Sequence, residues 1–483
     1  MRARILLSLC ICLLSIPLIA QDTLALTLDD VVKLARGQSV DALIATNRHS
    51  NANWNYQLFR ADRRPVLALN GTLPSFDRTI DAITQPDGTD LFVSRSLATS
   101  SLNLSLSQEI GFTGGSIFAG SGLQRIDLFG DSTITNYLSN PLFIGLQQPI
   151  LRFNPWKWRR QLEPLRMMQA DQTLLEDREE IAVQAVRLFF QMHLAQINLD
   201  IATTNKVNND TLYRISQGRY QLGKIAESDL LQVELNLLNA QVAMTRSENE
   251  VANAQAQLLR FLGLDENLSL DLIIPHDVVG LNIDPQKALE YAQSNRSDPI
   301  NFTVQRLEAE QEVARAKGNS GFSADLFVQY GLNNTSNGIG EAYRQPENFQ
   351  NVSLGLNIPI LDWGKARATR EIASANLDLV ESQLALQEIN FEQEIMLFVQ
   401  QFNLQDNQVA IAAKADTVAR RRFEVAMARY LIGKTAVTDL NIASNEEDQA
   451  RRAYILALQN YWLDFYNLRR LTLHDWVRNE PIR

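Results

Sequence analysis

Two stretches of this chain repeat the same pattern at a constant offset of 210 residues. Gly145–Leu151 (GLQQPIL) matches Gly355–Leu361 (GLNIPIL), and Arg219–Lys224 (RYQLGK) matches Arg429–Lys434 (RYLIGK). An offset that is kept between two separate motifs indicates two copies of one architectural unit. Each copy then buries its apolar face against its neighbour. We therefore expect the chain to fold as two related halves in one elongated body.

The first 20 residues have the pattern of a secretory signal peptide. Met1–Arg4 carries two positive charges, and the apolar run Ile5–Ile19 leads to Ala20 at the cleavage position. This run is short for a membrane helix, which needs about 18 apolar residues or more. Both cysteines, Cys10 and Cys12, lie inside the peptide. We expect an exported mature chain without thiols, with one repeat at 21–271 and the other at 272–483.

The composition gives no sign of an enzyme or a nucleic acid binder. The formal net charge is -10, and no run of Lys and Arg is interleaved with aromatic residues. The histidines show no HExxH spacing, and no GxSxG elbow is present. We therefore expect no catalytic site, no cofactor, no metal site and no nucleic acid partner. The four histidines are His49, His193, His276 and His474.

Two windows without proline, 165–274 and 360–480, predict helices that are too long for a compact domain. A helix over about 157–216 would be roughly 90 Å long. The next segment steps by three and four residues between apolar or small side chains, as a coiled-coil seam does. In the second copy, Glu447 and Asp464 occupy positions of the equivalent seam. We therefore expect the second seam to be partly wet or rotated. The first seam is Leu230, Val233, Leu237, Ala240, Met244, Ser247, Val251, Ala254, Leu258 and Phe261.

Short alternating segments precede these helices and predict β-strands. Residues 67–73, 142–147, 322–331 and 352–358 alternate between apolar and small or polar side chains. This alternation fits a membrane barrel with lipid outside and water inside, and it also fits a half-buried soluble sheet. The signal peptide and the lack of an apolar helix favour the barrel. Residues 100–125 alternate in the same way and could add a hairpin to the first copy.

The combination of four strands with long helices leads to a family. Four strands cannot enclose a channel, so such a chain must assemble with copies of itself. Three copies would give twelve strands above a tube of helical rods. At this point the chain resembles the TolC-like outer membrane efflux protein (outer membrane factor) family over nearly all of its mature length. The matching elements are an opening helix near 26–35, strand ends at Pro149 and Pro359, and the repeated turns at 220–223 and 430–433.

The resemblance implies an α+β membrane protein. Its β-barrel lies in the bacterial outer membrane, is shared by three protomers with about four strands each, and continues into a long periplasmic α-helical coiled-coil tube. The implied function is a passive, gated conduit of a tripartite efflux pump or a type I secretion system, exporting small molecules or polypeptide. The implied partners are a homotrimer, a periplasmic adaptor (membrane fusion) protein, an inner membrane transporter and outer membrane lipid. The alternative is a secreted periplasmic coiled-coil structural or adaptor protein, soluble without detergent.

The repeated turn admits two interpretations. The segment 218–225 (GRYQLGKI) is close to a phosphate-binding loop, but Ile225 replaces the Ser or Thr that holds magnesium. A turn between two long helices fits better, because Gly223 and Gly433 would relieve the strain of the reversal. The resemblance assigns this turn to adaptor docking through Tyr220, Leu222, Gly223, Tyr430, Ile432 and Gly433.

Two carboxylates close to the turns are candidates for a gate. The resemblance places Asp229 and Asp439 at the periplasmic entrance, where carboxylates of the family help to hold it shut. One helical turn later this chain has Gln232 and Ile442. That departs from a double ring of carboxylates. The alternative is that both Asp side chains cap a helix or lie in solvent.

Three tryptophans follow the predicted strands directly. Trp156, Trp158 and Trp363 lie beside Lys and Arg residues. Amphipathic rings of this kind settle at membrane interfaces, which makes them candidate anchors of the barrel. The alternative is packing at the start of a helix.

Overall fold

The computed structural model describes residues 23–130, 132–275 and 278–482. The expected signal peptide at 1–20 and His276 lie outside the described residues. The chain divides into two compact units. The division does not follow the two predicted repeats, because each unit takes residues from both of them. The first unit comprises Met1–His49, Asp171–Arg296 and Asn390–Arg483, and the second comprises Ser50–Ala170 and Ser297–Ile389.

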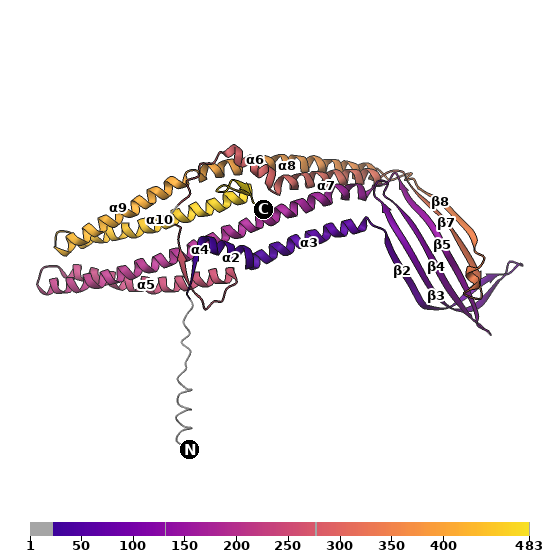
Figure 1. The fold of residues 1–483 in the computed structure, drawn as a ribbon, viewed down its shortest axis with the longest axis horizontal. Coiled ribbons are helices and arrows are strands. Elements are labelled where there is room, and N and C mark those ends of the chain that lie inside the picture. The colour runs from indigo at the N-terminus through magenta and orange to yellow at the C-terminus, as the bar shows by residue number, and fades with distance from the viewer. Residues whose placement is uncertain (1–22, 131, 276–277, 483) are drawn as a thin grey trace, which may run out of the picture. The chain divides into compact units, whose positions relative to one another are not determined.

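The second unit contains an antiparallel sheet of six strands in the order β2-β3-β4-β5-β7-β8 (Figure 1). This is two strands more than the four strongest candidates in the sequence. The additional pair is β3 and β4, so the segment 100–125 does add a hairpin. The strands are β2 (Val66–Thr84), β3 (Asp90–Ile110), β4 (Gly115–Phe129), β5 (Ile134–Ile150), β7 (Ser323–Ser336) and β8 (Glu347–Asn357).

The two faces of this sheet differ in chemistry. Successive side chains of a strand point to opposite faces, so the strand register shows which residues share a face. One face is apolar: Leu69 lies opposite Leu104, and Leu354 lies opposite Leu326. The other face carries mostly Ser, Asn, Gln and Gly. Exposed side chains of the apolar face include Leu67, Leu69, Leu102, Leu104, Leu106, Ile144, Val352, Leu354 and Leu356.

A small aromatic cluster interrupts the polar face. The rings of Phe118 and Phe327 stack with centroids 5.8 Å apart, and Phe118 meets Phe143 edge-on at 6.3 Å. These rings cover glycines of neighbouring strands. A Cβ atom on Gly120 would lie 2.6 Å from Cζ of Phe143. The glycines therefore allow the rings to lie flat against the sheet instead of standing away from it.

Four helices join this sheet. α3 (Val40–Asp62) leads into β2, and α4 (Pro155–Gln221) follows β5. In the second repeat α7 (Asp298–Asn319) leads into β7, and α8 (Lys365–Phe402) follows β8. The short 3-10 helix η1 (Glu341–Tyr343) lies between β7 and β8. Among the described residues, none of the helices combines the length and the apolar character that a membrane crossing requires.

The first unit is mainly helical. α4 and α5 (Glu227–Leu262) form one helical hairpin, and α9 (Gln405–Leu431) and α10 (Val437–Thr472) form the other. In α5 the seam predicted from the sequence is buried at every seventh residue, at Val233, Ala240, Ser247 and Ala254. Smaller elements complete the unit: β1 (Thr23–Thr27), α2 (Leu28–Gln38), β6 (Ser269–Ile273), α6 (Pro285–Asn295), β9 (His474–Asp475) and β10 (Glu480–Pro481).

The second window without proline is not one uninterrupted rod. The helix breaks between α8 and α9, at Asn403 and Leu404. There the Asn403 side chain accepts a hydrogen bond from the backbone N–H of Ile283 at 3.0 Å and donates to its carbonyl at 2.8 Å. The break therefore attaches the segment before α6 to the helical hairpin. Sequence reasoning missed it because Asn is only mildly unfavourable inside a helix.

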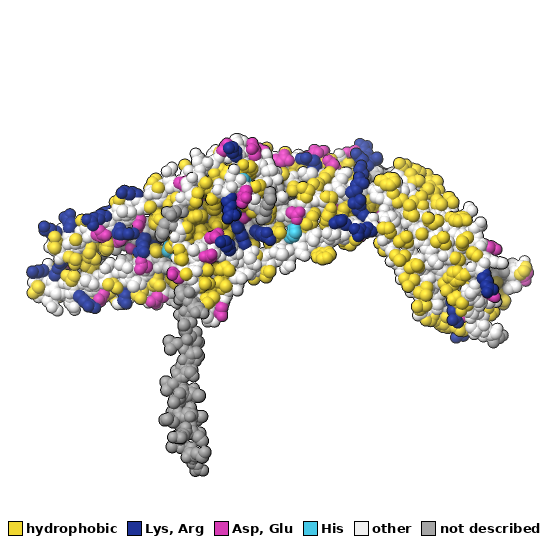
Figure 2. All heavy atoms as spheres, in the orientation of Figure 1, with side chains coloured by type: hydrophobic (Ala, Val, Ile, Leu, Met, Phe, Trp, Pro, Cys, Tyr) yellow, Lys and Arg dark blue, Asp and Glu magenta, His cyan; other side chains and the backbone are white. Residues whose placement is uncertain are grey.

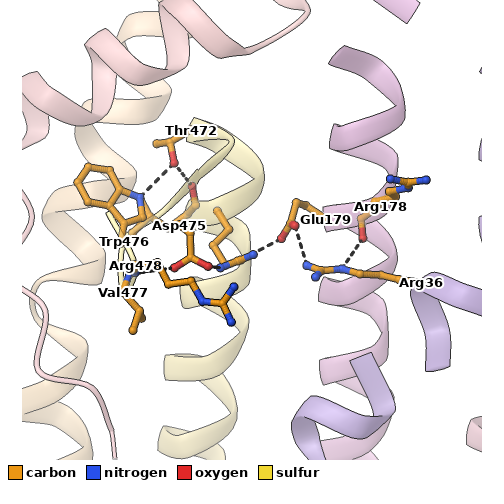
Figure 3. Close-up of polar contacts among 10 residues, drawn as sticks. Arg36, Arg178, Glu179, Thr472, Asp475, Trp476, Val477 and Arg478 are labelled. Carbon is orange, nitrogen blue, oxygen red and sulfur yellow. Dashed lines mark hydrogen bonds and ion pairs between the residues drawn. The ribbon is translucent and has the colours of Figure 1, made fainter. Parts of the chain in front are cut away.

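A buried ion cluster joins three segments that lie far apart in the sequence. The Glu179 side chain in α4 is 1% exposed and lies 2.6 Å from the guanidinium of Arg36 in α2. Its other carboxylate oxygen accepts from Nε of Arg469 in α10 at 3.2 Å. Arg469 also contacts Asp475 at 2.6 Å. Figure 3 shows Arg36 and Glu179 pointing toward each other, with Asp475 at the C-terminal turn.

Candidate functional site

The two repeated turns share one backbone geometry. In each, a glycine with positive φ ends the first helix: φ is +69° at Gly223 and +76° at Gly433. The glycine N–H donates to the carbonyl three residues earlier, and the next N–H donates to the carbonyl five residues earlier. This pair of bonds defines a Schellman motif, which a glycine stabilises because it has no Cβ to clash. The turn follows helix α4, whereas a phosphate-binding loop follows a strand.

The side chains at the two turns are not equivalent. Tyr430 is 4% exposed and joins Leu212, Val233 and Leu440 in a buried cluster, so all four long helices meet there. Its counterpart Tyr220 is 41% exposed. Of the six residues assigned to adaptor docking, Tyr430 is therefore a packing residue. The apolar side chains that the turns expose most are those of Leu222 and Ile432, and Leu431 is also exposed.

Arg219 links the two turns and was not singled out in the sequence. Its guanidinium donates to the backbone carbonyl of Leu431 at 3.2 Å and lies 5.2 Å from the ring centroid of Tyr430. In addition, the Tyr430 hydroxyl lies 3.2 Å from Oγ of Ser216. These contacts fasten the two turns together. The sequence signal was present, since Arg219 and Arg429 repeat, but the repeat does not show which arginine makes the contacts.

Asp229 and Asp439 lie in the first turns of α5 and α10. Both are exposed, and the helix caps are Ala226 and Ala436, neither of which makes a side-chain capping bond. The two carboxylates are therefore not N-caps. A negative charge in the first turn interacts favourably with the helix dipole. It also remains free to contribute to the field outside the turn.

A polar groove of about 570 Å³ lies among α4, α5 and α10. Asn205 donates to Asp448 at 2.7 Å, and Arg452 donates to Asn198 at 2.8 Å. Burial raises the pKa of Asp448, and the hydrogen bond from Asn205 opposes this only in part. The spacing of the asparagines by three, four or seven residues could have revealed this face. They are Asn198, Asn205, Asn209, Asn236, Asn239, Asn441 and Asn445.

The polar residues expected in the second seam are indeed partly buried. Burial raises the pKa of Glu447, and the nearby charge of Asp448 adds to the shift. Burial also raises the pKa of Asp464, which accepts a hydrogen bond from Gln405 at 2.7 Å. Carboxylates thus replace apolar contacts along part of α10. This agrees with the expectation of a partly wet seam.

The three tryptophans differ in their surroundings. Trp363 is 89% exposed in the link between β8 and α8. Trp156 is half-buried at the start of α4, with the guanidinium of Arg159 4.9 Å from its ring centroid. Trp158 is also half-buried and lies near Lys157. Packing at the helix start therefore accounts for much of the Trp156 surface, but not for Trp363.

The comparison with protein families decides the class of the chain. The model of the outer membrane efflux protein family matches residues 31–264 and 293–472, well over half of the chain. This chain belongs to the outer membrane efflux protein family. The match covers both helical hairpins and all six strands of the sheet. The alternative of a secreted coiled-coil structural protein does not account for it. Among curated protein sequences, none matches the chain.

Solved channels share the fold of this outer membrane efflux protein. The CmeC outer membrane channel of Campylobacter jejuni aligns with a TM-score of 0.66 at 17% identity, over 92% of this chain and 85% of that one. The outer-membrane channel OprN gives 0.65 at 16%, over 92% and 89%. VceC of Vibrio cholerae gives 0.65 at 13%, over 94% and 97%. Identities this low establish a common fold and nothing finer.

Family and fold together place the chain in the outer membrane, with its helices extending into the periplasm. Its role is passage through a channel and not catalysis. The sheet supplies the membrane part, as the sequence predicted. In chain order, each turn comes after a helix that leaves the sheet.

Proposed function

We propose that three copies of this chain form a passive, gated conduit that receives cargo from an inner membrane transporter through a periplasmic adaptor. The observation that supports this most is an open sheet with an exposed apolar face, in a chain whose helical hairpins end in two exposed turns. A soluble protein rarely leaves such a large apolar surface uncovered. Lipid covers that face if the sheet is part of a barrel wall.

The chemistry beside the sheet supports this orientation in the membrane. Figure 2 shows hydrophobic side chains gathered over the strands, and Lys and Arg side chains gathered where helices meet strands. The exposed basic residues there include Arg63, Arg160, Lys317, Lys365 and Arg367. Cations at this level attract anionic lipid headgroups, and exposed Trp363 lies in the same region. We assign Trp363 as the strongest interface anchor, and Trp156 and Trp158 as secondary ones.

The two turns are the proposed docking surface for the adaptor. Leu222 and Ile432 are exposed apolar side chains next to glycines with open space around them. A partner helix can approach such a surface closely because no Cβ atom intervenes. Arg219 and Tyr430 hold the two turns in a fixed relation beneath it. The inner membrane transporter that joins the complex would decide which type of exporter forms and which cargo it carries.

Trimer formation is the first test of this proposal. The mature protein, purified in detergent, is expected to have the mass of three chains and a circular dichroism spectrum with both helix and strand. Cells that lack the gene are expected to become more sensitive to some antibiotics, dyes, metals or bile salts. Light scattering and growth inhibition measure these outcomes. A monomer in detergent would contradict the proposal.

Charge selectivity tests the proposed gate at Asp229 and Asp439. If three copies bring these carboxylates around the entrance, their mutual repulsion creates a field that favours cations. Asp439→Asn is then expected to reduce cation selectivity and leave the trimer intact, because exposed charges contribute little to stability. The measurement is the reversal potential in planar bilayers under a salt gradient. Asp41→Asn removes the same charge from the exposed start of α3 and is the matched control.

An equal reversal potential for wild type and Asp439→Asn would remove Asp439 from the gate. A decrease of the same size in Asp41→Asn would assign selectivity to net charge instead of to the entrance.

A further inference from the structure

The six-stranded sheet ends in two strands with only one neighbour each. β2 forms one edge and β8 the other, and each therefore has a row of backbone N–H and C=O groups without a sheet partner. In the hydrocarbon core no water can satisfy such groups, so open edges do not persist in lipid. Something must pair with both edges when the apolar face lies in the membrane.

The chain cannot pair its own edges. Six strands are fewer than the roughly eight that the smallest membrane barrels contain. The partner for each edge must therefore come from another chain. A second copy is the partner whose geometry fits, because it offers the complementary edge.

Strand direction agrees with this pairing. β2 begins at the end of α3 and runs away from the helices, whereas β8 runs back toward α8. An edge-to-edge contact between copies therefore brings antiparallel strands together. Since six is an even number, the alternation of strand direction continues around a ring of copies without a break.

The β3–β4 hairpin is an integral part of the wall. β3 pairs with β2 from Ser107 opposite Val66 to Asp90 opposite Thr84, and with β4 from Ile110 to Ser96. Leu102 lies opposite Leu123, so the apolar face continues across the hairpin. If the β3–β4 hairpin left the sheet, its hydrogen bonds to β2 and to β5 would be lost. The apolar face would then be divided between two separate surfaces.

The inner turn of the hairpin is also fastened to the start of α4. The Asn154 side chain accepts from the N–H of Trp156 at 2.9 Å and donates to the carbonyl of Phe112 at 3.2 Å. Gln148 donates to the carbonyl of Thr113 at 3.2 Å. The turn is therefore held beside the strand that leads into α4, at the same level as the other helix junctions.

The helices next to the two edges carry exposed apolar side chains. On α8, after β8, Ile372, Leu379 and Leu386 recur every seven residues and are 70%, 53% and 60% exposed. On α3, before β2, Trp54 and Leu58 are 69% and 59% exposed. A seven-residue apolar repeat is the pattern of a helix that packs against another helix. Both edges of the sheet thus continue into helices that need a partner.

We infer that the shared barrel has eighteen strands, six from each of three copies, with β2 of one copy paired to β8 of the next. The contact is heterologous and closes as a ring, in which α3 and α8 extend the same seam beyond the membrane. The inference rests on the proposed function, which supplies three copies. Because barrel diameter grows about linearly with strand number, this barrel is roughly one and a half times as wide as one of twelve strands.

Disulfide trapping of this seam is the test. Ser353→Cys in β8 is combined in turn with Ala68→Cys, Asn70→Cys and Thr72→Cys in β2, all on the polar face. A scan is needed because the shear of the closed barrel sets the register. The native cysteines lie at 10 and 12, so removal of the expected signal peptide leaves no background thiol. Oxidised outer membranes are then analysed by electrophoresis without reductant.

The expected result is covalent dimers and trimers for at least one of the three β2 positions. Ser353→Cys alone should give none. One comparison is Ser353→Cys with Ser116→Cys in β4, since β4 would form the seam if the β2–β3 hairpin lay outside a narrower wall. The other is Asn70→Cys with Asn103→Cys, which are opposite each other in β2 and β3. This pair is expected to form a bond within one chain, and its absence would overturn the eighteen-strand barrel, because a folded-out β3–β4 hairpin would leave the β2–β8 seam unchanged. Crosslinking through Ser116→Cys only, or through no pair in a chain that light scattering shows to be trimeric, would overturn the eighteen-strand barrel and leave the proposed function standing. A monomer in detergent would overturn both.

Discussion

Gly433→Trp is expected to abolish export while trimers still assemble in the outer membrane. Gly433 has φ +76°, and a Cβ atom there would meet no other atom within 4 Å, so an indole would protrude into the space a docking partner needs. The left-handed backbone adds a strain of about 1–2 kcal/mol for a residue with a Cβ. That local cost is small for a turn at the end of two long helices. Export in a deletion strain and crosslinking to the adaptor measure the effect.

A matched variant separates strain from obstruction. Gly433→Asn places a small side chain at the same position, and Asn tolerates the left-handed region better than most residues do. We expect Gly433→Asn to keep most of the export activity. Normal export by Gly433→Trp trimers would show that the turn is not a docking surface. A similar loss in both variants would assign the effect to the backbone.

The location of the turns followed from the sequence, but the difference in burial between their tyrosines did not. A glycine repeated between two helical windows predicts a reversal, and both glycines have the positive φ that such a turn requires. The repeat predicted equal roles for Tyr220 and Tyr430. Only one of them is buried, because the burial depends on which hairpin face packs against the other. Packing between segments about 210 residues apart leaves no local trace in the sequence.

The sheet was also predicted only in part, because strand pairing between distant segments is not visible in the sequence. Strands with leucine at alternate positions were evident, and all four strong candidates are strands. Much of the β3–β4 hairpin alternates leucine with serine, or is rich in glycine, and such a segment has a weak signal on its own. Its position between β2 and β5 depends on pairing along its whole length. Consequently the sequence predicted four strands for each chain, whereas the sheet has six.

Glu179 could not be selected from the sequence, because it is one of many acidic residues in a long amphipathic helix. In the structure it is enclosed by Arg36 and Arg469 at the point where α2 and α10 meet α4. Figure 3 shows how the C-terminal turn with Trp476 and Val477 lies close to this cluster. The cluster is thus a fixed point of the first unit.

Glu179→Gln is expected to destabilise the protein by about 2–3 kcal/mol, below the full cost of breaking a buried ion pair, because it keeps the side-chain shape but removes the counter-charge of two partly buried guanidinium groups. Arg469 keeps its ion pair with Asp475 at 2.6 Å. Most of the loss in stability therefore arises at Arg36. The measurement is the urea dependence of the helical circular dichroism signal of the purified protein in detergent. Glu250→Gln is the matched control, since the Glu250 pair with Arg246 is exposed and contributes about 0.5 kcal/mol or less. Equal stability of the two variants would mean that water reaches the cluster and that Glu179 is an ordinary surface carboxylate.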